Sequence, residues 1–304
     1  MLNWLKNRFS DLDPIYIINR IDDKYKEFYY KSMPDEYILK KRFKKRLGRE
    51  LQLDNPHRYN DKLQWLKLYW RDPLAAKCAD KYEVRQYVAE KIGNKYLNEL
   101  YGVYKSVNEI NLDELPKSFV LKATHGSGFN IICKDKNMMN WSKEFRRMRR
   151  WLKRNYYWKS REWVYRDIEP RIVCEKYLQE KAAADLRDYK IFCFGGEPKL
   201  IQVDYDRFKN HRRNLYDLEW NLLDVEIKYP RDDSIIINRP ANLELLLDLS
   251  GKLSQGFPHV RVDFYLVNGQ IFFGELTFFH ASGRGKFRPE EFELVMGEWL
   301  NLPL

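Results

Sequence analysis

Residues 259–277 read HVRVDFYLVNGQIFFGELT, in which two apolar runs flank Asn268-Gly269. An Asn-Gly pair between two apolar segments is typical of a β-hairpin with a tight two-residue turn. Each run carries one carboxylate, Asp263 in the first and Glu275 in the second, among otherwise apolar side chains. The stretch therefore predicts a hairpin that places two acidic side chains in apolar surroundings.

These two carboxylates need a source of positive charge. Burying a lone carboxylate is costly unless the group is paired, hydrogen-bonded or bound to a cation. Two carboxylates that face each other also repel. A divalent metal between them is the simplest solution, and the hard oxygen ligands point to Mg²⁺. The alternative is that one carboxylate lies at a solvated strand end while the other pairs with an arginine. The hairpin by itself leaves both arrangements open.

The composition indicates a globular protein with a substantial core. The chain has 304 residues, of which 44% are hydrophobic and 15% aromatic. No apolar stretch approaches the roughly 18 residues that a membrane-spanning helix needs. Residues 1–9 lack the apolar core of a secretory signal, so we expect an ordinary first helix or a short amphipathic helix at a membrane surface. Four dispersed cysteines favour buried free thiols in a reducing cytoplasm over a disulfide framework or a zinc site.

The chain is also strongly basic. Its 55 lysine and arginine residues give a formal net charge of +11. This charge predicts an anionic partner, such as nucleic acid, anionic lipid, nucleotide phosphate or acidic polysaccharide. The densest cluster, KKRFKKR at residues 40–46, is interpreted as a solvated helix face. Residues 141–171 combine arginine with tryptophan. They could line a groove for an acidic glycan, bind nucleic acid by stacking, or form a helix whose tryptophans belong to the core.

Hydrophobic periodicity separates a helical N-terminal region, residues 1–75, from a mixed α and β region, residues 76–304. A helix is predicted to begin at Asp80-Lys81 and to end at Gly93, and another to cover residues 243–253. Besides the hairpin, strands are predicted at residues 119–123, 131–133, 173–178, 189–194 and 198–203.

A glycine-containing loop, Gly126-Ser127-Gly128, lies between the first two of these strands. Glycines allow backbone N–H groups to turn toward an anion without obstruction by Cβ atoms, which can create a phosphate-binding concavity. Lys122 lies four residues before the loop and could neutralise a phosphate there. By itself the loop is a weak signal, and it matches neither the P-loop nor the dinucleotide-binding pattern.

In their order along the chain, these features resemble the ATP-grasp superfamily. The residues that carry the resemblance are Lys81, Lys122, Gly126-Ser127-Gly128, Glu175-Lys176-Tyr177-Leu178, Asp188, Arg261, Asp263 and Glu275. It implies that Lys81, Lys122 and the glycine loop hold the phosphates of ATP. It also implies that the strand Glu175–Leu178 lines the adenine pocket through the backbone of Lys176 and Leu178. Asp188 would contact the ribose hydroxyls, and Lys190 is a plausible additional phosphate ligand.

The same resemblance implies the roles of the hairpin residues. Asp263 and Glu275 correspond to the two magnesium-binding carboxylates, and Arg261 corresponds to an arginine that stabilises the reacting oxyanion. Thr277 occupies a position where the superfamily usually has asparagine as a further metal ligand. A hydroxyl binds Mg²⁺ more weakly than a carboxamide oxygen, so the number of magnesium ions, one or two, stays open.

A closer resemblance, over about residues 55–290, is to the TupA-like ATP-grasp family, which is linked with bacterial surface polysaccharides. It rests on the segments DKLQWLKLY (61–69), DKYEVR (80–85), FVLKATHGSG (119–128), DYKIF (188–192) and GELTFF (274–279). This resemblance implies an α+β ATP-grasp fold, in which two α+β subdomains clasp ATP. The small nucleotide-clasping subdomain is expected at about residues 117–175.

The implied activity is ATP-dependent joining of a carboxylate to an amine through an acylphosphate. The expected partners are ATP, an amino acid or amine, and an acidic glycan or uronic-acid sugar nucleotide of capsule biosynthesis; either organic partner could supply the carboxylate. Arg284, with Lys286, suits an acidic acceptor, so Arg261, Lys122 and Arg284 are the expected catalytic residues.

Two other functions remain open, a glycosyltransferase of capsule biosynthesis and a polyanion-binding protein without catalysis. We do not expect a nucleic-acid partner. The expected location is the cytoplasm, with peripheral association at the inner face of the membrane as a further option.

Overall fold

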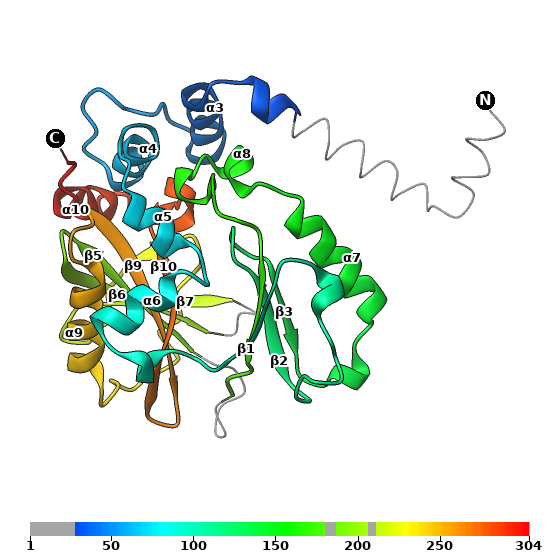
Figure 1. Ribbon diagram of the computed structural model, residues 1–304. Coiled ribbons are helices and arrows are strands. Elements are labelled where there is room, and N and C mark those ends of the chain that lie inside the picture. The colour runs from blue at the N-terminus through cyan, green and yellow to red at the C-terminus, as the bar shows by residue number, and fades with distance from the viewer. Residues whose placement is uncertain (1–27, 180–186, 206–210, 304) are drawn as a thin grey trace, which may run out of the picture.

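The computed structural model describes residues 28–179, 187–205 and 211–303 (Figure 1). The expectation of a first helix at residues 1–9 lies outside these ranges. Two sheets with separate cores form the body of the described structure. Among the described helices, none is long and apolar enough to cross a membrane.

The smaller sheet has four antiparallel strands in the order β1-β4-β2-β3. Their bounds are β1 Leu100–Tyr104, β2 Phe119–Ala123, β3 Asn130–Cys133 and β4 Ile172–Lys176. Alternate side chains of β2 are buried, and they form a core with Met148 and Trp151 of α7 (Trp141–Leu152). The small subdomain therefore begins with β1 at Leu100, earlier than the expected residue 117.

The tryptophan- and arginine-rich segment contains α7 and helps to build both cores. Trp151 is buried, and the Trp141 ring stacks on Phe119 with 5.7 Å between ring centroids. Trp163 belongs to the larger core, where it packs against Trp70. These contacts account for the tryptophans by packing, which was one of the three interpretations of residues 141–171.

The larger sheet has five antiparallel strands in the order β10-β9-β5-β6-β7. Their bounds are β5 Asp188–Phe194, β6 Glu197–Tyr205, β7 Arg212–Tyr216, β9 His259–Val267 and β10 Gln270–Thr277. Helix α9 (Leu243–Ser254) packs on β5, β6 and β9 (Figure 1). A two-stranded sheet pairs β8 (Glu226–Ile227) with β11 (Phe287–Arg288).

The predicted hairpin is confirmed as β9 and β10. Its turn residues Asn268 and Gly269 have φ values of 49° and 79°, as a type I′ turn requires. A bulge at Gly274 interrupts the pairing, and beyond it Glu275 lies directly opposite Asp263. Because neighbouring residues of a strand point to opposite faces, this extra residue puts both carboxylates on one face of the sheet.

The helical part of the chain packs against the C-terminal helix and does not form a separate unit. Its helices are α3 Asp35–Leu47, α4 Tyr59–Tyr69, α5 Pro73–Ala79 and α6 Val84–Lys91, and the C-terminal helix is α10 Phe292–Trp299. Arg49 joins Asp61 of α4 to Glu293 of α10 through Nη1–Oδ2 and Nη2–Oε1 distances of 2.8 and 2.9 Å.

The remaining helical segments are short. They are α8 Tyr156–Ser160 and the 3₁₀ turns η1 Asn94–Tyr96, η2 Val107–Glu109, η3 Lys136–Met138, η4 Trp163–Tyr165 and η5 His280–Gly283. All four cysteines are buried and free. This agrees with the expected burial of the thiols.

A buried histidine connects α4 to the large sheet. His259 of β9 donates from Nδ1 to the carbonyl oxygen of Cys193 (2.9 Å), and its Nε2 accepts from the Tyr59 hydroxyl (2.8 Å). The ring is 1% exposed. Burial, the largest of several effects, lowers the pKa of His259 to about 3. The ring is therefore neutral in the folded protein.

Acidification should therefore destabilise the fold through His259. The unfolded chain binds the proton near the ordinary histidine pKa of 6.5, whereas the folded chain does so only near 3. Stability attributable to this group is thus lost as the pH falls through this window, by about 2 kcal/mol between pH 7 and pH 5. Denaturant unfolding of wild type and His259→Gln at both pH values checks this. An equal loss in the two proteins would show that His259 does not cause it.

Candidate functional site

Asp263 lies at the centre of a buried cluster of charges on the large sheet. Arg261 binds its carboxylate in a bidentate manner, with Nε–Oδ1 and Nη2–Oδ2 distances of 2.6 Å each. Lys190 of the adjacent strand β5 lies opposite Asp263 in the register, and its Nζ is 2.9 Å from Oδ2. Since bidentate and charge-assisted hydrogen bonds are the strong ones, two cations neutralise this carboxylate.

Glu275 faces the cleft between the sheets and is less enclosed. Its side chain is 38% exposed, and its nearest cations are Arg261 Nη2 at 3.6 Å and Lys81 Nζ at 3.9 Å. Burial of the group would raise its pKa, but Lys81, Arg261, Lys190 and Lys122 outweigh this effect and lower the pKa of Glu275 to about 2. Glu275 is therefore an anion at any ordinary pH.

The arrangement of charges corresponds to the second of the two hypotheses for the hairpin. Arg261 pairs with Asp263, and Glu275 is partly solvated. The residues also fit Mg²⁺, because two carboxylates and the hydroxyl of Thr277 lie on one hairpin face, with Thr277 Oγ1 3.3 Å from Glu275 Oε1. No group of three or more histidine, cysteine or acidic residues gathers within the described ranges. A magnesium ion here would take further ligands from water and phosphate, as is usual for Mg²⁺.

The small sheet contributes a second pair of charges across the cleft. Lys122 of β2 donates to Glu175 Oε2 of β4 at 2.6 Å, and Arg85 Nη1 is 3.5 Å from Glu175 Oε1. Together with Gly274 and neighbouring side chains, these groups line a cavity of only about 10 Å³. A nucleotide base is larger than this space, so a nucleotide requires movement of side chains or separation of the two sheets.

The glycine loop connects β2 and β3 as predicted. Ser127 and Gly128 are exposed, and Gly128 has a φ of 77°, which favours glycine. A Cβ atom on Gly126 would lie 3.0 Å from Cε2 of Phe129 and 3.1 Å from the Cβ of Tyr156, so a larger residue requires these neighbours to shift. Lys81 Nζ donates to the Gly126 carbonyl oxygen at 2.7 Å. The two expected nucleotide lysines, Lys81 and Lys122, therefore line the same small cavity, and Lys81 also contacts the loop.

The strand end at residues 175–178 fits its expected role only in part. The N–H of Lys176 already donates to the Glu99 carbonyl oxygen (3.0 Å), and its carbonyl oxygen accepts from Asn98 Nδ2 (2.9 Å). The expected adenine contact through the Lys176 N–H is thus blocked, although a carbonyl oxygen can accept a second hydrogen bond. Tyr177 and Leu178 follow the end of β4 and are half-buried.

Asp188 and Lys190 lie deeper than a nucleotide contact requires. Asp188 is 1% exposed, and its Oδ2 lies 3.2 Å from Lys190 Nζ. The expected ribose contact of Asp188 therefore disagrees with its burial. Lys190 interacts with Asp188 and Asp263 at once, and this pairing competes with the expected phosphate contact.

The turn that follows β10 supports the charge cluster. His280 of η5 accepts from Arg261 Nη1 at its Nδ1 (2.7 Å). The next residues, Ala281 and Ser282, have left-handed φ values of 47° and 56°, which are unfavourable for residues with a Cβ. Lys67 Nζ donates to the Ser282 carbonyl oxygen and hydroxyl at 3.0 and 2.8 Å, and Gln64 Nε2 donates to the Gly283 carbonyl oxygen at 2.6 Å.

The sequence gives only a weak indication that Gln64 and Lys67 support this turn. Gln64 and Lys67 are three residues apart on α4, among the apolar side chains of its buried stripe, and both are buried. Arg284 follows the same turn but lies away from the carboxylate pair, in a separate cavity beside α3. The expected catalytic residues Arg261 and Lys122 line the cleft region, whereas Arg284 does not.

Comparisons with known proteins match the chain to one family and to several solved structures. The family model described as TupA-like ATPgrasp matches residues 61–301. The D-alanine–D-alanine ligase from Bacillus anthracis in complex with ATP is 16% identical with a TM-score of 0.38, over 66% of this chain and 53% of that chain. The corresponding ligase from Helicobacter pylori is 15% identical with a TM-score of 0.40, over 81% and 69%.

A third solved structure is the ATP-grasp ligase PsnB complexed with a phosphomimetic variant of its minimal precursor, Mg and ADP. It is 8% identical with a TM-score of 0.42, over 79% of this chain and 66% of that chain. The chain spans 53% of the length of the Bacillus anthracis ligase in complex with ATP. No curated protein sequence matches it.

The bulge at Gly274 should be sensitive to substitution. A Cβ atom there would lie 3.0 Å from the Asp263 carbonyl oxygen, so Gly274→Ala should lower the free energy of unfolding by about 1–3 kcal/mol. The matched control is Gly251→Ala in helix α9, where the nearest atom lies 3.5 Å away. There alanine should be neutral or stabilising, by up to about 1 kcal/mol. Denaturant unfolding tests both variants, and equal stabilities would refute the steric argument.

Proposed function

Because the chain belongs to the TupA-like ATP-grasp family, and so has the expected α+β ATP-grasp fold, we propose that it is an ATP-dependent ligase that joins a carboxylate to an amine. The observation that carries the proposal is the layout of the cleft. Lys81 and Lys122 line one small cavity together with Gly274 of the hairpin. Lys81 also donates to the glycine loop, and its Nζ lies 3.9 Å from Glu275, which in turn lies 3.6 Å from Arg261. Cations opposite a metal-compatible acidic pair suit the triphosphate of ATP.

In the proposed reaction, a carboxylate oxygen attacks the γ-phosphorus of ATP. The bond between that phosphorus and the β–γ bridging oxygen breaks, which yields ADP and an acylphosphate. An amine nitrogen then attacks the acyl carbon, loses a proton, and inorganic phosphate leaves as the amide forms. Phosphoryl transfer of this kind depends mainly on positioning and charge neutralisation.

The residues of the cleft would divide this work. Lys81, Lys122 and the N–H groups of the glycine loop would hold phosphate oxygens, which requires Lys122 to exchange Glu175 for the nucleotide. Arg261 would stabilise the oxyanion of the tetrahedral intermediate, with His280 and Asp263 keeping its guanidinium in place. Bound at Asp263, Glu275 and Thr277, Mg²⁺ would supply neutralisation of phosphate charge.

The nucleoside would lie near the end of β4. The Lys176 carbonyl oxygen retains a lone pair for the adenine amino group, and Leu178 supplies the next backbone group. Asp188 and Lys190 remain part of the proposal as ribose and phosphate ligands, on the condition that their mutual ion pair opens. We further propose that one organic substrate is a uronic-acid residue of a capsule or wall polysaccharide precursor and that the other is an amino acid or amine.

The proposed activity predicts that ADP release depends on the hairpin carboxylates. ATP, Mg²⁺ and paired uronates and amines should yield ADP together with an amide product detectable by mass spectrometry. Asp263→Asn and Glu275→Gln should each reduce the rate by about 10²–10³-fold, the range for loss of a group that stabilises developing charge. The control is Asp248→Asn on α9, where the carboxylate is half exposed and pairs with Lys252.

Nucleotide-sugar binding in preference to ATP would instead support a glycosyltransferase. No nucleotide binding, together with full polyanion binding by the two hairpin variants, would support a protein without catalysis. Either result would refute the ligase.

Lys122 should contribute to nucleotide affinity. Lys122→Met removes a cation from the cleft and should weaken binding of Mg·ATP at least tenfold, since about 1.4 kcal/mol corresponds to a factor of ten. Lys117→Met is the matched control, because Lys117 precedes the same strand but is 74% exposed and pairs with Asp135. Titration calorimetry measures both, and equal affinities for the two variants would remove Lys122 from the phosphate site.

A further inference from the structure

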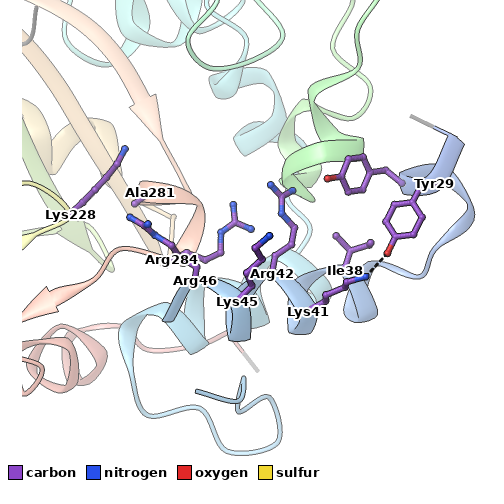
Figure 2. A pocket seen from close by; sticks show the side chains of 10 residues that line it. Tyr29, Ile38, Lys41, Arg42, Lys45, Arg46, Lys228, Ala281 and Arg284 are labelled. Carbon is purple, nitrogen blue, oxygen red and sulfur yellow. Dashed lines mark hydrogen bonds between the residues drawn. The ribbon is translucent and has the colours of Figure 1, made fainter. Parts of the chain in front are cut away.

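A second cavity lies between α3 and the turn that follows β10. Its volume is about 770 Å³, within the range of about 300–1,000 Å³ typical of small-molecule sites. Figure 2 shows basic side chains of α3 on one side of this space and those of Lys228 and Arg284 on the other. Six basic residues line it: Lys41, Arg42, Lys45, Arg46, Lys228 and Arg284.

These cations lack the acidic partners that a solvated helix face usually has. The other lining residues are tyrosine, isoleucine and alanine, with no carboxylate. Within the described ranges, Lys45, Arg46, Lys228 and Arg284 have no carboxylate within 4.0 Å. Burial lowers the pKa of Arg284 to about 10, and the charges of Arg42 and Arg46 act in the same direction, whereas the nearby carboxylate of Glu162 opposes them. So many like charges around one space are unfavourable until an anion enters it.

The basic run at residues 40–46 has two different faces. Lys40 pairs with Glu36 and Lys44 pairs with Glu50, and both lysines are about half exposed or more. Lys45 and Arg46 belong instead to the cavity, whereas Phe43 is fully buried in a core beneath the helix. The run is solvated as interpreted, since Lys45 and Arg46 are exposed as well, but these two residues also line the cavity.

Two of the cavity side chains are held in position by protein groups. Lys41 Nζ donates to the Tyr29 hydroxyl at 3.0 Å, and Arg42 donates to the carbonyl oxygen of Lys159. Three of the six cations are arginines, whose planar guanidinium group binds carboxylate or phosphate in a bidentate manner. These features favour a multivalent anion as the ligand.

One wall of the cavity directly follows, in the sequence, a residue that contacts the reaction site. Ala281 forms part of its wall and directly follows His280, which accepts a hydrogen bond from Arg261. Tyr156, which is half-buried, also lies near this cavity: the charges of Arg42 and Arg284 act on its hydroxyl, and its ring packs against Tyr165 at 5.2 Å between centroids. A substrate in the cavity would thus lie beside the turn that holds the oxyanion arginine.

We propose that this cavity binds the acidic oligosaccharide substrate through several of its carboxylates at once. The basic side chains of α3 would make most of these contacts. The proposal rests on the proposed function for the identity of the substrate. Helix α3 precedes residues 61–301, the part that matches the family model. The proposed recognition of substrate charge therefore rests mainly on a helix that lies outside the matched region.

The test compares two double variants of the same helix. Lys45→Ala/Arg46→Ala removes two charges from the cavity face, and Lys40→Ala/Lys44→Ala removes two from the opposite face. The full chain is titrated with a tetragalacturonate by calorimetry, without nucleotide, and Mg·ATP affinity is measured separately. We expect binding of tetragalacturonate that weakens with salt, at least a tenfold loss in the cavity variant, less than a twofold change in the control, and unchanged Mg·ATP affinity in both.

Several results would overturn the assignment. These are no binding of tetragalacturonate by wild type, equal losses in the two double variants, or tighter binding of tripolyphosphate, which would identify a phosphate ligand. Because the titration omits ATP, its outcome is separate from that of the ligase assay. A chain that binds the uronate but releases no ADP would refute the ligase and leave the cavity assignment standing.

Discussion

The site depends on the neutralisation of Asp263 inside the large sheet. A buried carboxylate is tolerated only if nearby cations and hydrogen bonds replace its lost hydration. Arg261 and Lys190 provide this from positions that the pairing of β5 with β9 sets. A shift of either strand by one residue would turn one partner to the opposite face. The neutralisation of Asp263 therefore requires this strand register, and the buried charges in turn favour this register over a shifted one.

The helical region extends this dependence beyond the sheets. Lys67 and Gln64 hold the left-handed turn at Ala281 and Ser282, and the turn presents His280 to Arg261. The same helix, α4, contacts α10 through the pair of Asp61 and Arg49 with Glu293. Backbone strain at a functional site persists when surrounding contacts determine it, and here buried amide and ammonium groups on α4 provide these contacts.

Much of the fold could be predicted from the sequence because its signals are local. The Asn268-Gly269 turn and the alternation of apolar and polar side chains around Lys122 can be recognised from a few neighbouring residues. The bulge at Gly274 was not predicted, because glycine in a strand has several explanations and only the partner strand distinguishes them. The family model covers residues 61–301, so the expected fold class is confirmed, whereas the substrates remain proposals.

The charge partners were harder to predict, because they come from distant parts of the chain. Neither the pair of Lys122 with Glu175 nor the burial of Asp188 has a local signature. The two faces of residues 40–46 depend on Lys228 and Arg284, which are nearly two hundred residues or more away in the sequence. Patterns within one element cannot report what packs against it.

The ion pair of Lys122 and Glu175 has a consequence for ligand exchange. Glu175 already pairs with the ammonium group of Lys122, which a phosphate would bind in the proposed function. Asp263 pairs with the guanidinium group of Arg261 in the same way. The protein thus carries its own competing anions, which orient these cations in the structure. In the proposed ligase, an incoming nucleotide would gain only the difference between its own contacts and these internal ones. Such a balance would limit affinity and so favour rapid release of the spent nucleotide.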